Sequence, residues 1–455
     1  MKKLFYIFIF IVLTLPLLSQ SLFTIKKADV FKQTKDGRKI IYGNVSIEYD
    51  IYKVDCDSAI VGKDIKSAKL FKNVVLKDTS MTIYCDKADI YRYDDKRSAY
   101  FFGNVMIKHE ETTVYGEYAN LMELFDRITV KDSVRVEYHP FPSILFCKEL
   151  KYDMKNEIAS SNSVDSVFAL DSLRYYELKT NRFTYDFSSS ILKLNTRYEL
   201  EVYEMQDSIP NVAKFPPIDI LGIKKDKNFK NWSKISAKKG FFDFENNIFS
   251  ADGGCKFVRY ETEDPDTTYF SCDNIDYSAG TEIIQMDKSI ILDKGALSVT
   301  TDHGEIHQSK DLIKLLKTPK IIFENHTVTG DTIFIYVDTE TSSPKEVSVI
   351  NDAFFESIPD STEMEEKNQM SGKKMDIWFD KEKLSKILIS KEAEALYYIR
   401  EDENSPSKAS NYLLGDTLVI KLDEKGVTNA NVKGGCEGIY SPDNLKKKTI
   451  KRKIK

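Results

Sequence analysis

Runs in which apolar and polar residues alternate fill most of the chain. In one such run Val45, Ile47 and Tyr49 alternate with Ser46 and Glu48. A period of two over short runs that are rich in Val, Ile, Tyr, Phe and Thr is typical of half-buried β-strands. No segment after residue 21 shows a long helical period with caps. The pattern therefore predicts an all-β fold.

The runs belong to a repeat of about thirty residues. Each copy has two motifs. The first has five positions: a small or turn residue; Asn or Ser; Val; any residue; Ile or Leu. The second, further on, has six positions: an apolar residue; any residue; Cys or Gly; Asp or Glu; any residue; Ala or Leu. The Cys or Gly positions of the first four copies are Cys56, Cys85, Gly116 and Cys147, which lie 29, 31 and 31 residues apart. A fixed period means that one unit is stacked on copies of itself. We expect two or three short strands per copy, stacked into two facing sheets with apolar inner sides.

The rhythm of the repeat divides the chain. A first array is expected over residues 23–206 and a second over 235–440. Between them, residues 207–234 contain Pro210, Pro216, Pro217 and a cluster of lysines, which indicates a connector. Residues 441–455 are strongly basic and are expected to form a disordered tail.

The N-terminus has the features of an export signal. A positive start is followed by the apolar stretch 4–18 and by the small residues Ser19 and Ser21. This order predicts a secretory signal peptide over residues 1–21, and the apolar stretch is short for a membrane span. An uncleaved anchor is the alternative. Either interpretation places the rest of the chain outside the cytoplasm.

The composition does not favour nucleic acid as a partner. The net charge is −5 among 455 residues, of which 30% are charged, and 25 Tyr and 27 Phe give the aromatic content of a strand-rich chain. No basic stripe of the kind that binds nucleic acid occurs in the repeats. No nucleic-acid partner is therefore expected.

Four of the six cysteines share one position of the repeat: Cys56, Cys85, Cys147 and Cys272. In an oxidising compartment, stacked neighbours such as Cys56 and Cys85 could form disulfides. Glycine and threonine fill the same position in other copies, so the position requires a small residue, and a free cysteine behaves as a small hydrophobic residue. Buried, reduced thiols are the favoured interpretation.

The acids and histidines do not form the pattern of a catalytic or metal site. In six copies an aspartate stands next to the cysteine position of the repeat: Asp57, Asp86, Asp273, Asp302, Asp331 and Asp416. One acid per copy indicates a turn-forming or outward-facing role, whereas a β-helix enzyme needs a single carboxylate cluster. His303 and His307 are four residues apart in strand-like sequence, which does not favour a metal site. We expect no catalytic residue, no metal and no cofactor, and hence no enzyme.

The repeat, behind a signal peptide, resembles the OstA-like periplasmic proteins of bacterial lipopolysaccharide transport. The segment Gly415 to Ile420, with Val427, Val432 to Gly435 and Ile439-Tyr440, resembles the periplasmic domain of the outer-membrane translocon in that family. The resemblance implies a semi-open β-jellyroll in the periplasm, possible association with the outer membrane, and a greasy interior that carries the acyl chains of lipopolysaccharide. It implies neither a cofactor nor covalent chemistry.

On this interpretation the alternating apolar residues line a lipid trough. One face is expected to consist of Val45, Ile47, Val74, Leu76, Val105, Ile107, Val134 and Val136, with Val54, Ile83, Val114 and Leu145 opposite. Each buried methylene contributes about 0.8 kcal/mol, so acyl chains need no specific polar site. The expected ligand is lipopolysaccharide or a related glycolipid.

The ends of a stack expose strand edges. No capping unit is evident before Tyr42, so the first strand is expected to dock other jellyroll transport proteins end to end, together with inner- or outer-membrane transport components. Two alternatives stay open: a structural or adhesive β-solenoid with a closed core, and a polysaccharide-active β-helix enzyme. A trough tolerates small residues among the apolar ones, whereas a closed core is filled in every layer.

Overall fold

The computed structural model describes residues 23–49, 52–78, 81–93, 96–122, 127–139, 142–209, 216–223, 229–262, 264–338, 344–358, 366–380, 383–399, 407–423 and 426–442. Nearly all of these residues are in β-strands, and neighbouring strands in these ranges pair antiparallel. The helices among them are the short α1 (Ile220–Ile223), η3 (Pro217–Asp219) and η4 (Gln308–Lys310). The all-β prediction is confirmed. The expected signal peptide (1–21) and most of the basic tail lie outside the described residues.

The chain forms two compact units, Met1–Phe249 and Ser250–Lys455. The strands of the first unit are β1 (Phe23–Lys27), β2 (Val30–Gln33), β3 (Lys39–Tyr49), β4 (Tyr52–Val61), β5 (Ser67–Lys77), β6 (Met81–Tyr93), β7 (Lys96–His109), β8 (Thr112–Met122), β9 (Arg127–Tyr138), β10 (Ser143–Asp153), β11 (Ile158–Ser161), β12 (Val164–Leu170), β13 (Arg174–Thr180), β14 (Phe183–Asp186), β15 (Ile191–Leu194), β16 (Tyr198–Met205), β17 (Phe229–Ala237) and β18 (Lys239–Asp243).

The second unit holds the remaining strands. They are β19 (Ile248–Glu261, which starts just before the boundary), β20 (Asp264–Ser278), β21 (Ile283–Lys294), β22 (Leu297–His307), β23 (Leu312–Leu316), β24 (Lys320–Phe323), β25 (His326–Thr329), β26 (Thr332–Val337), β27 (Pro344–Ser357), β28 (Asn368–Asp380), β29 (Lys383–Ile399), β30 (Ala409–Asp423), β31 (Gly426–Lys433) and β32 (Glu437–Pro442).

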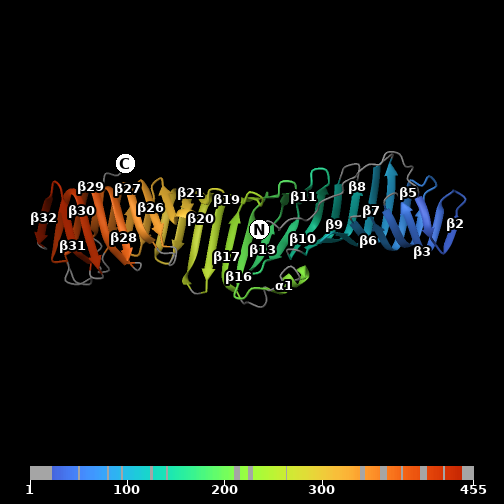
Figure 1. Cartoon of the computed structure of the whole chain (residues 1–455), viewed down its shortest axis with the longest axis horizontal. Helices are drawn as coiled ribbons and strands as arrows, with labels where there is room; N and C mark the ends of the chain where they lie inside the picture. Colours follow the sequence, from blue (N-terminus) through green and yellow to red (C-terminus); the bar gives the residue numbers. More distant parts are fainter. Residues whose placement is uncertain are drawn as a thin grey trace. The chain divides into compact units, whose positions relative to one another are not determined.

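In the first unit, β3 to β10 follow one another as an antiparallel meander, and Figure 1 shows them side by side. Each of these strands is 10–14 residues long and bends near its middle. One repeat is therefore a pair of long bent strands. The expectation of two or three short strands per copy is wrong in this respect, because the turn residues inside the repeat bend a strand instead of ending it.

The first residues of the repeat form the bend. Gly43 and Asn44 have φ of 81° and 48°, and together they lie opposite the single residue Asp57 of β4. This is a bulge, which kinks a strand and increases its twist. Glycine and asparagine are the residues that tolerate positive φ best. The same paired left-handed conformation recurs at 72–73, 103–104, 132–133, 253–254, 288–289, 317–318, 351–352, 391–392 and 434–435.

Each bend splits its strand between two facing layers. We call half-sheet A the layer that contains 39–42, 58–61 and their neighbours, and half-sheet B the layer that contains 45–49, 52–56 and their neighbours. Past β10 the two layers carry separate labels: β11, β14, β15 and β18 continue half-sheet A, and β12, β13, β16 and β17 continue half-sheet B. The second unit repeats this plan, with bent strands such as β27 to β30.

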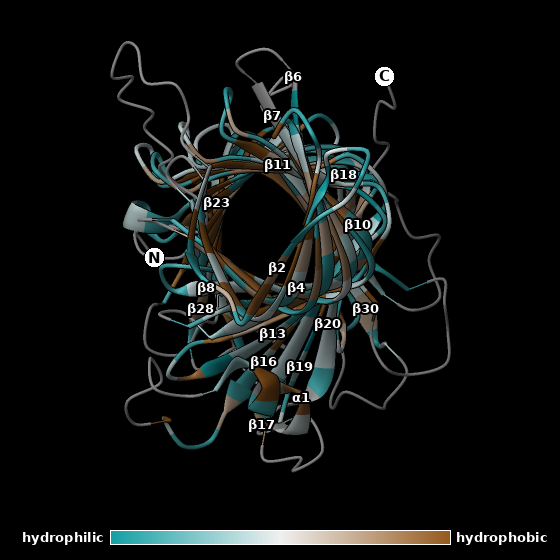
Figure 2. Cartoon of the chain, turned by 90° about the vertical axis from the view of Figure 1, so that its right-hand side faces the viewer, coloured by the Kyte–Doolittle hydropathy of each residue, from teal (hydrophilic) through white to brown (hydrophobic). Residues whose placement is uncertain are grey.

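The two half-sheets enclose the core. In half-sheet A the inner residues alternate between large and small across neighbouring strands, in the register order Ile41, Ala59, Leu70, Ala88, Phe101, Ala119 and Val130. Alternation of this kind lets neighbouring side chains interdigitate. All seven are buried in one apolar cluster with the inner residues of half-sheet B. Figure 2 shows hydrophobic and hydrophilic residues alternating along the strand ribbons.

Two segments differ from the boundaries drawn on the sequence. The expected connector, 207–234, lies within the first unit, and its last six residues already belong to β17. The chain also has strands before Tyr42: β1 and β2 both pair with β3. Among the described strands the outermost edge therefore lies on β1 and β2 and not on β3, as was expected.

Candidate functional site

The sequence placed a trough on twelve apolar residues, and the structure brings all of them to half-sheet B. Eleven are buried and Leu145 is half-buried. They do not face one another across the interior, however. Ile47 is the register partner of Val54, and Val114 is the partner of Val136, so the two predicted faces are neighbouring strands of one layer. The opposite wall is half-sheet A, with Ile41, Leu70 and Phe101 among its residues.

One inner row of half-sheet B runs through twelve strands. In register order it consists of Ile47, Val54, Leu76, Ile83, Ile107, Val114, Val136, Leu145, Val167, Leu178, Leu200 and Ile235. Every member is aliphatic. Such a row offers a continuous apolar wall to a hydrocarbon chain and no hydrogen-bonding group.

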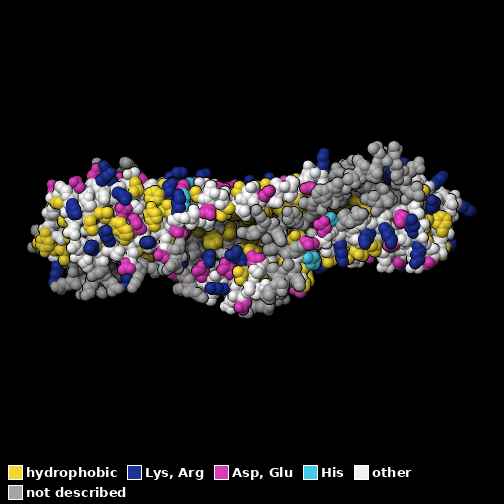
Figure 3. Space-filling model, in the orientation of Figure 1, with side chains coloured by type: hydrophobic (Ala, Val, Ile, Leu, Met, Phe, Trp, Pro, Cys, Tyr) yellow, Lys and Arg dark blue, Asp and Glu magenta, His cyan; other side chains and the backbone are white. Residues whose placement is uncertain are grey.

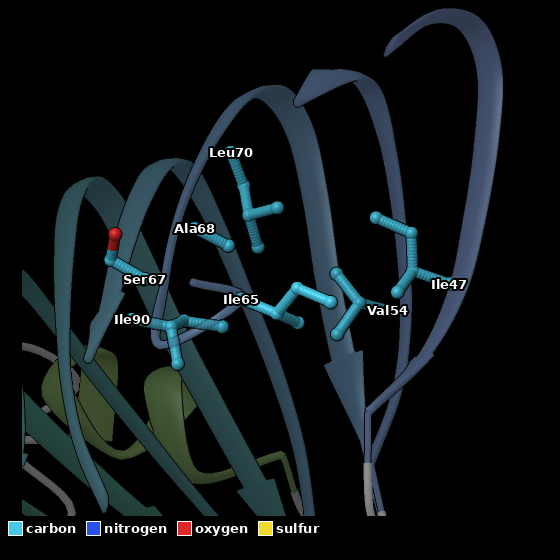
Figure 4. A pocket seen from close by; sticks show the side chains of 7 residues that line it. All are labelled: Ile47, Val54, Ile65, Ser67, Ala68, Leu70 and Ile90. Carbon is cyan, nitrogen blue, oxygen red and sulfur yellow. The ribbon is translucent and has the colours of Figure 1, made fainter. Parts of the chain in front are cut away.

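The first part of this row, from Ile47 to Val136, is a closed section. Its members are all buried, and the cavity that lies beside Ile47 and Val54 has a volume of only about 10 Å³. Figure 4 shows Ile47 and Val54 of half-sheet B lining that cavity together with Leu70 and Ile90 of half-sheet A. A cavity of this size holds about one water molecule. An acyl chain enters the closed section only if the half-sheets move apart.

The second part, from Leu145 to Ile235, is an open section. Leu145, Val167, Leu178, Leu200 and Ile235 are all half-buried, although each continues the row in register. The change occurs where β10 gives way to the separate pieces β11 and β12. The interior of the first unit is therefore accessible along part of its length and packed along the rest.

The second unit shows the same contrast in the reverse order along the chain. Its inner row begins with the half-buried Tyr277, Ile284, Ile306 and Ile313. The row then continues through five buried residues, Ile335, Val347, Ile377, Ile387 and Ile420. Open and closed sections are thus present in each unit separately.

The Cys or Gly position of the repeat lies at the bend, where space is short. A Cβ atom on Gly116 would stand 2.6 Å from Cγ1 of Val130, so the position admits only small side chains. Cys56, Cys85 and Cys147 are buried there as free thiols. Their strands β4, β6 and β10 are never adjacent, and strands two apart are separated by about 9.5 Å. Disulfides between stacked neighbours are excluded, because they require Cα atoms within about 7 Å.

The aspartate beside that position holds the bend. Nδ2 of Asn73 donates to both carboxylate oxygens of Asp57 at 3.2 Å, and Nδ2 of Asn104 donates to Asp86 at 2.9 Å. The asparagine of one bend thus hydrogen-bonds to the acid of the preceding strand. Asp57 and Asp86 therefore have a structural role, in line with the turn-forming role that the sequence predicts.

Burial also sets the reactivity of the thiols. It raises the pKa of Cys56 to about 11 and that of Cys85 and Cys147 to about 12. These thiols therefore stay protonated at mildly alkaline pH, where an exposed thiol ionises appreciably. Iodoacetamide is expected to modify the exposed Cys436 within minutes and these three thiols only after denaturation, as peptide mass spectrometry would show. Rapid labelling of Cys85 in the folded chain would contradict the packed bend.

The two histidines lie in a network of carboxylates. Nδ1 of His303 is 2.6 Å from Oδ1 of Asp287, and Nε2 of His307 is 2.9 Å from Oε2 of Glu305. Burial acts to raise the pKa of Glu305, but hydrogen bonds from His307, His303 and Lys314 outweigh it and lower that pKa. Within the described ranges, no three His, Cys, Asp or Glu side chains form a group that could hold a metal ion. No helix in the same ranges is long and apolar enough to cross a membrane.

These features define a class of protein, the β-jellyrolls that enclose an apolar interior between two half-sheets. Residues 60–201 match the model of the OstA-like protein family, so this region of the chain is OstA-like, and the resemblance seen in the repeat is confirmed. The crystal structure of LptH from Pseudomonas aeruginosa, described as the LptA-homologous periplasmic component of the lipopolysaccharide transport device, matches with a TM-score of 0.25 and 13% identity. That match covers 32% of this chain and 95% of LptH. Comparison with curated proteins gives no match.

Proposed function

We propose that the protein is a periplasmic lipid carrier and bridge, which shields the acyl chains of lipopolysaccharide or a related glycolipid between its half-sheets on the way to the outer membrane. The aliphatic inner row of half-sheet B carries this proposal. The row continues through twelve strands without a polar side chain, and part of it is accessible. At about 0.8 kcal/mol per buried methylene, a chain of several methylenes is held firmly by contact alone. No catalytic group and no cofactor take part.

The open section is where we place the lipid. Its half-buried residues already expose apolar surface, so an acyl chain that covers Leu178 and Leu200 removes that surface from water without first breaking a packed core. In the closed section the same chain would have to displace contacts between Ile83 and the opposite wall. Lipid therefore enters sideways at the open section and moves further only where the layers separate.

The ends of the fold supply the contacts of a bridge. Among the described strands, β1 and β2 pair only with β3, and β31 and β32 pair only with β30. Unpaired strand edges accept a further strand by β-augmentation. Other jellyroll transport proteins, and transport components of the inner or outer membrane, are the partners that we propose for these edges. On the face drawn in Figure 3, positive and negative side chains are interspersed with hydrophobic ones.

A structural or adhesive β-solenoid is the second candidate. The closed section favours it, because Ile47 to Val136 are packed as in an ordinary core. The half-buried row from Leu145 to Ile235 favours the carrier, because a purely structural stack gains nothing from an exposed interior.

Photocrosslinking separates these two functions. A benzophenone residue at Leu178, on the inner face of β13, is expected to capture lipopolysaccharide in cells, and one at the adjacent outward Lys179 is not, because neighbouring residues of a strand point to opposite faces. Val105 and Ile83 report on the closed section, with Lys108 and Glu117 as outward controls. Equal labelling at Leu178 and Lys179, or none at any inner position, would exclude the carrier.

A further inference from the structure

The first strand of the second unit carries a variant of the repeat that has a second cysteine. Gly253, Gly254 and Cys255 stand where the first array has Gly43, Asn44 and Val45. The equivalence is structural, because Gly253 and Gly254 have φ of 87° and 85°, the paired left-handed conformation that marks each bend. Cys255 therefore occupies the position of the buried valine that follows a bend.

The next strand carries a cysteine at the position that faces this valine. In the first unit Val45 is the register partner of Cys56, and Val105 is the partner of Gly116. Cys272 corresponds to Cys56: its Sγ donates to the carbonyl oxygen of Asn274 at 3.2 Å, as the Sγ of Cys56 donates to that of Ser58 at 3.3 Å. Cys255 and Cys272 thus occupy facing positions on the neighbouring strands β19 and β20.

Contacts in the second unit agree with this register. The Sγ of Cys255 lies 3.5 Å from the carbonyl oxygen of Asp273, the residue next to Cys272. The two thiols also share a hydrogen bond, which lowers the pKa of Cys255 against the opposing effect of its burial. A lower pKa favours the thiolate, which is the form that attacks a disulfide oxidant.

We propose that Cys255 and Cys272 are a modification site: they form an intrachain disulfide when the chain folds in an oxidising compartment. Facing residues of an antiparallel pair have Cα atoms about 4.5–5.5 Å apart, within the range that a disulfide spans. The oxidant is a disulfide, either of a thiol oxidoreductase or of glutathione. One thiolate attacks it to give a mixed disulfide, the second thiolate displaces the reduced thiol, and the two protons and two electrons leave with the oxidant.

The other cysteines lack such a partner. The residue that faces Cys56 is Val45, the one that faces Cys85 is Val74, and the one that faces Cys147 is Val134. Cys436 is exposed. The site is therefore specific to one strand pair. Both of its thiols are buried, so the bond forms during folding, and it then clamps β19 to β20 at their bends, beside the open section of the second unit.

The test uses the full chain carrying Cys436→Ser, refolded with oxidised and reduced glutathione and alkylated under denaturing conditions. We expect an intact mass, taken before alkylation, that is lower by two hydrogen atoms than the mass of the reduced chain. We also expect a peptide that links Cys255 to Cys272, and alkylation of Cys56, Cys85 and Cys147. Reductant should lower Tm by roughly 5–10 °C. The substitution Cys255→Val, which installs the residue that follows the bends of β3, β5, β7 and β9, should remove both the bond and the effect of reductant.

A matched positive control comes from the first unit. Val45→Cys places a thiol opposite Cys56, and a disulfide there shows that the facing register allows the bond and that the refolding mixture is oxidising enough. Complete alkylation of Cys255 and Cys272 in the same chain would overturn the proposal. The refolding test does not depend on lipid binding, so its failure leaves the proposed function standing, and an absence of lipid capture leaves the disulfide standing.

Discussion

Aspartate at two positions of the same inner row is expected to give opposite results. Ile83 lies in the closed section and is buried, so Ile83→Asp places a carboxylate where it has neither water nor a partner. The free energy of unfolding is expected to fall by about 4 kcal/mol or more, measured by urea denaturation. Ile83→Val, which only removes a methylene, should cost about 1 kcal/mol.

Leu178→Asp, in the open section, is expected to leave the chain folded and to remove its lipid. The half-buried side chain of Leu178 reaches solvent, so the new carboxylate stays hydrated and costs about 2 kcal/mol or less. An acyl chain that lay against Leu178 would now meet a charge. Lipopolysaccharide retained by the purified chain should fall at least about tenfold, since losing two methylene contacts already has that effect. Lys179→Asp, on the outward face of the same strand, is the control.

Two outcomes of these substitutions would contradict lipid binding at the open section. If Leu178→Asp unfolds the chain as severely as Ile83→Asp, then the row is packed throughout and lipid has no accessible surface. If it leaves lipid retention unchanged, acyl chains bind elsewhere.

Lysines on the first strand edge are expected to abolish association between jellyrolls. Val30 and Phe31 of β2 are 38% and 51% exposed, and β2 pairs with β3 alone among the described strands. Charged residues on an edge, lysine above all, prevent a further strand from adding. At high protein concentration the native chain should form end-to-end oligomers in sedimentation experiments, and the double variant Val30→Lys/Phe31→Lys should stay monomeric.

Tyr269 provides the matched control for the edge. Its side chain is 54% exposed, but its strand β20 has neighbours on both sides, β19 and β21. Tyr269→Lys therefore adds the same charge without touching an edge and should oligomerise like the native chain. Both variants should keep their stability within about 0.5 kcal/mol. A native chain that stays monomeric, and binds no membrane transport component, would rule out the bridge.

The repeat predicted the fold because its pattern encodes the strand and the bend together. Alternation in runs such as 45–49 identifies the buried side of a strand. The recurring motif of a turn residue, Asn or Ser, and Val marks the bends. The sequence did not show that these signals are bends. Turn residues such as Gly43 and Asn44 end a strand in most contexts. Strand β3 continues past them, because Tyr42 pairs with Ser58 on one side and Val45 pairs with Cys56 on the other.

The same ambiguity explains the error about the trough walls. A period of two shows which residues share a face, and Ile47 and Val54 do share one. It does not show that the chain crosses to the other layer at the bend, so the half-sheet A residues Ile41, Leu70 and Phe101 were missed. The alanine that ends each of the first three copies (Ala59, Ala88 and Ala119) was the available signal, because a small residue recurring on every second strand implies a large one between. Solvent access to Leu178 could not be predicted, since it depends on how far apart the two layers lie.

The paired left-handed residues also restrict how such a chain can change length. They occur on every second strand of the first meander, at β3, β5, β7 and β9, and the first three pairs are each opposed by one acid of the next strand, Asp57, Asp86 and Glu117. Inserting one strand would set two strands of the same kind side by side, so that a bulge would lose its opposing acid or an acid would lose its bulge. Inserting two strands restores the alternation. Family members of different reach should therefore differ by even numbers of strands, and a deletion that removes an odd number should fail to fold at the join.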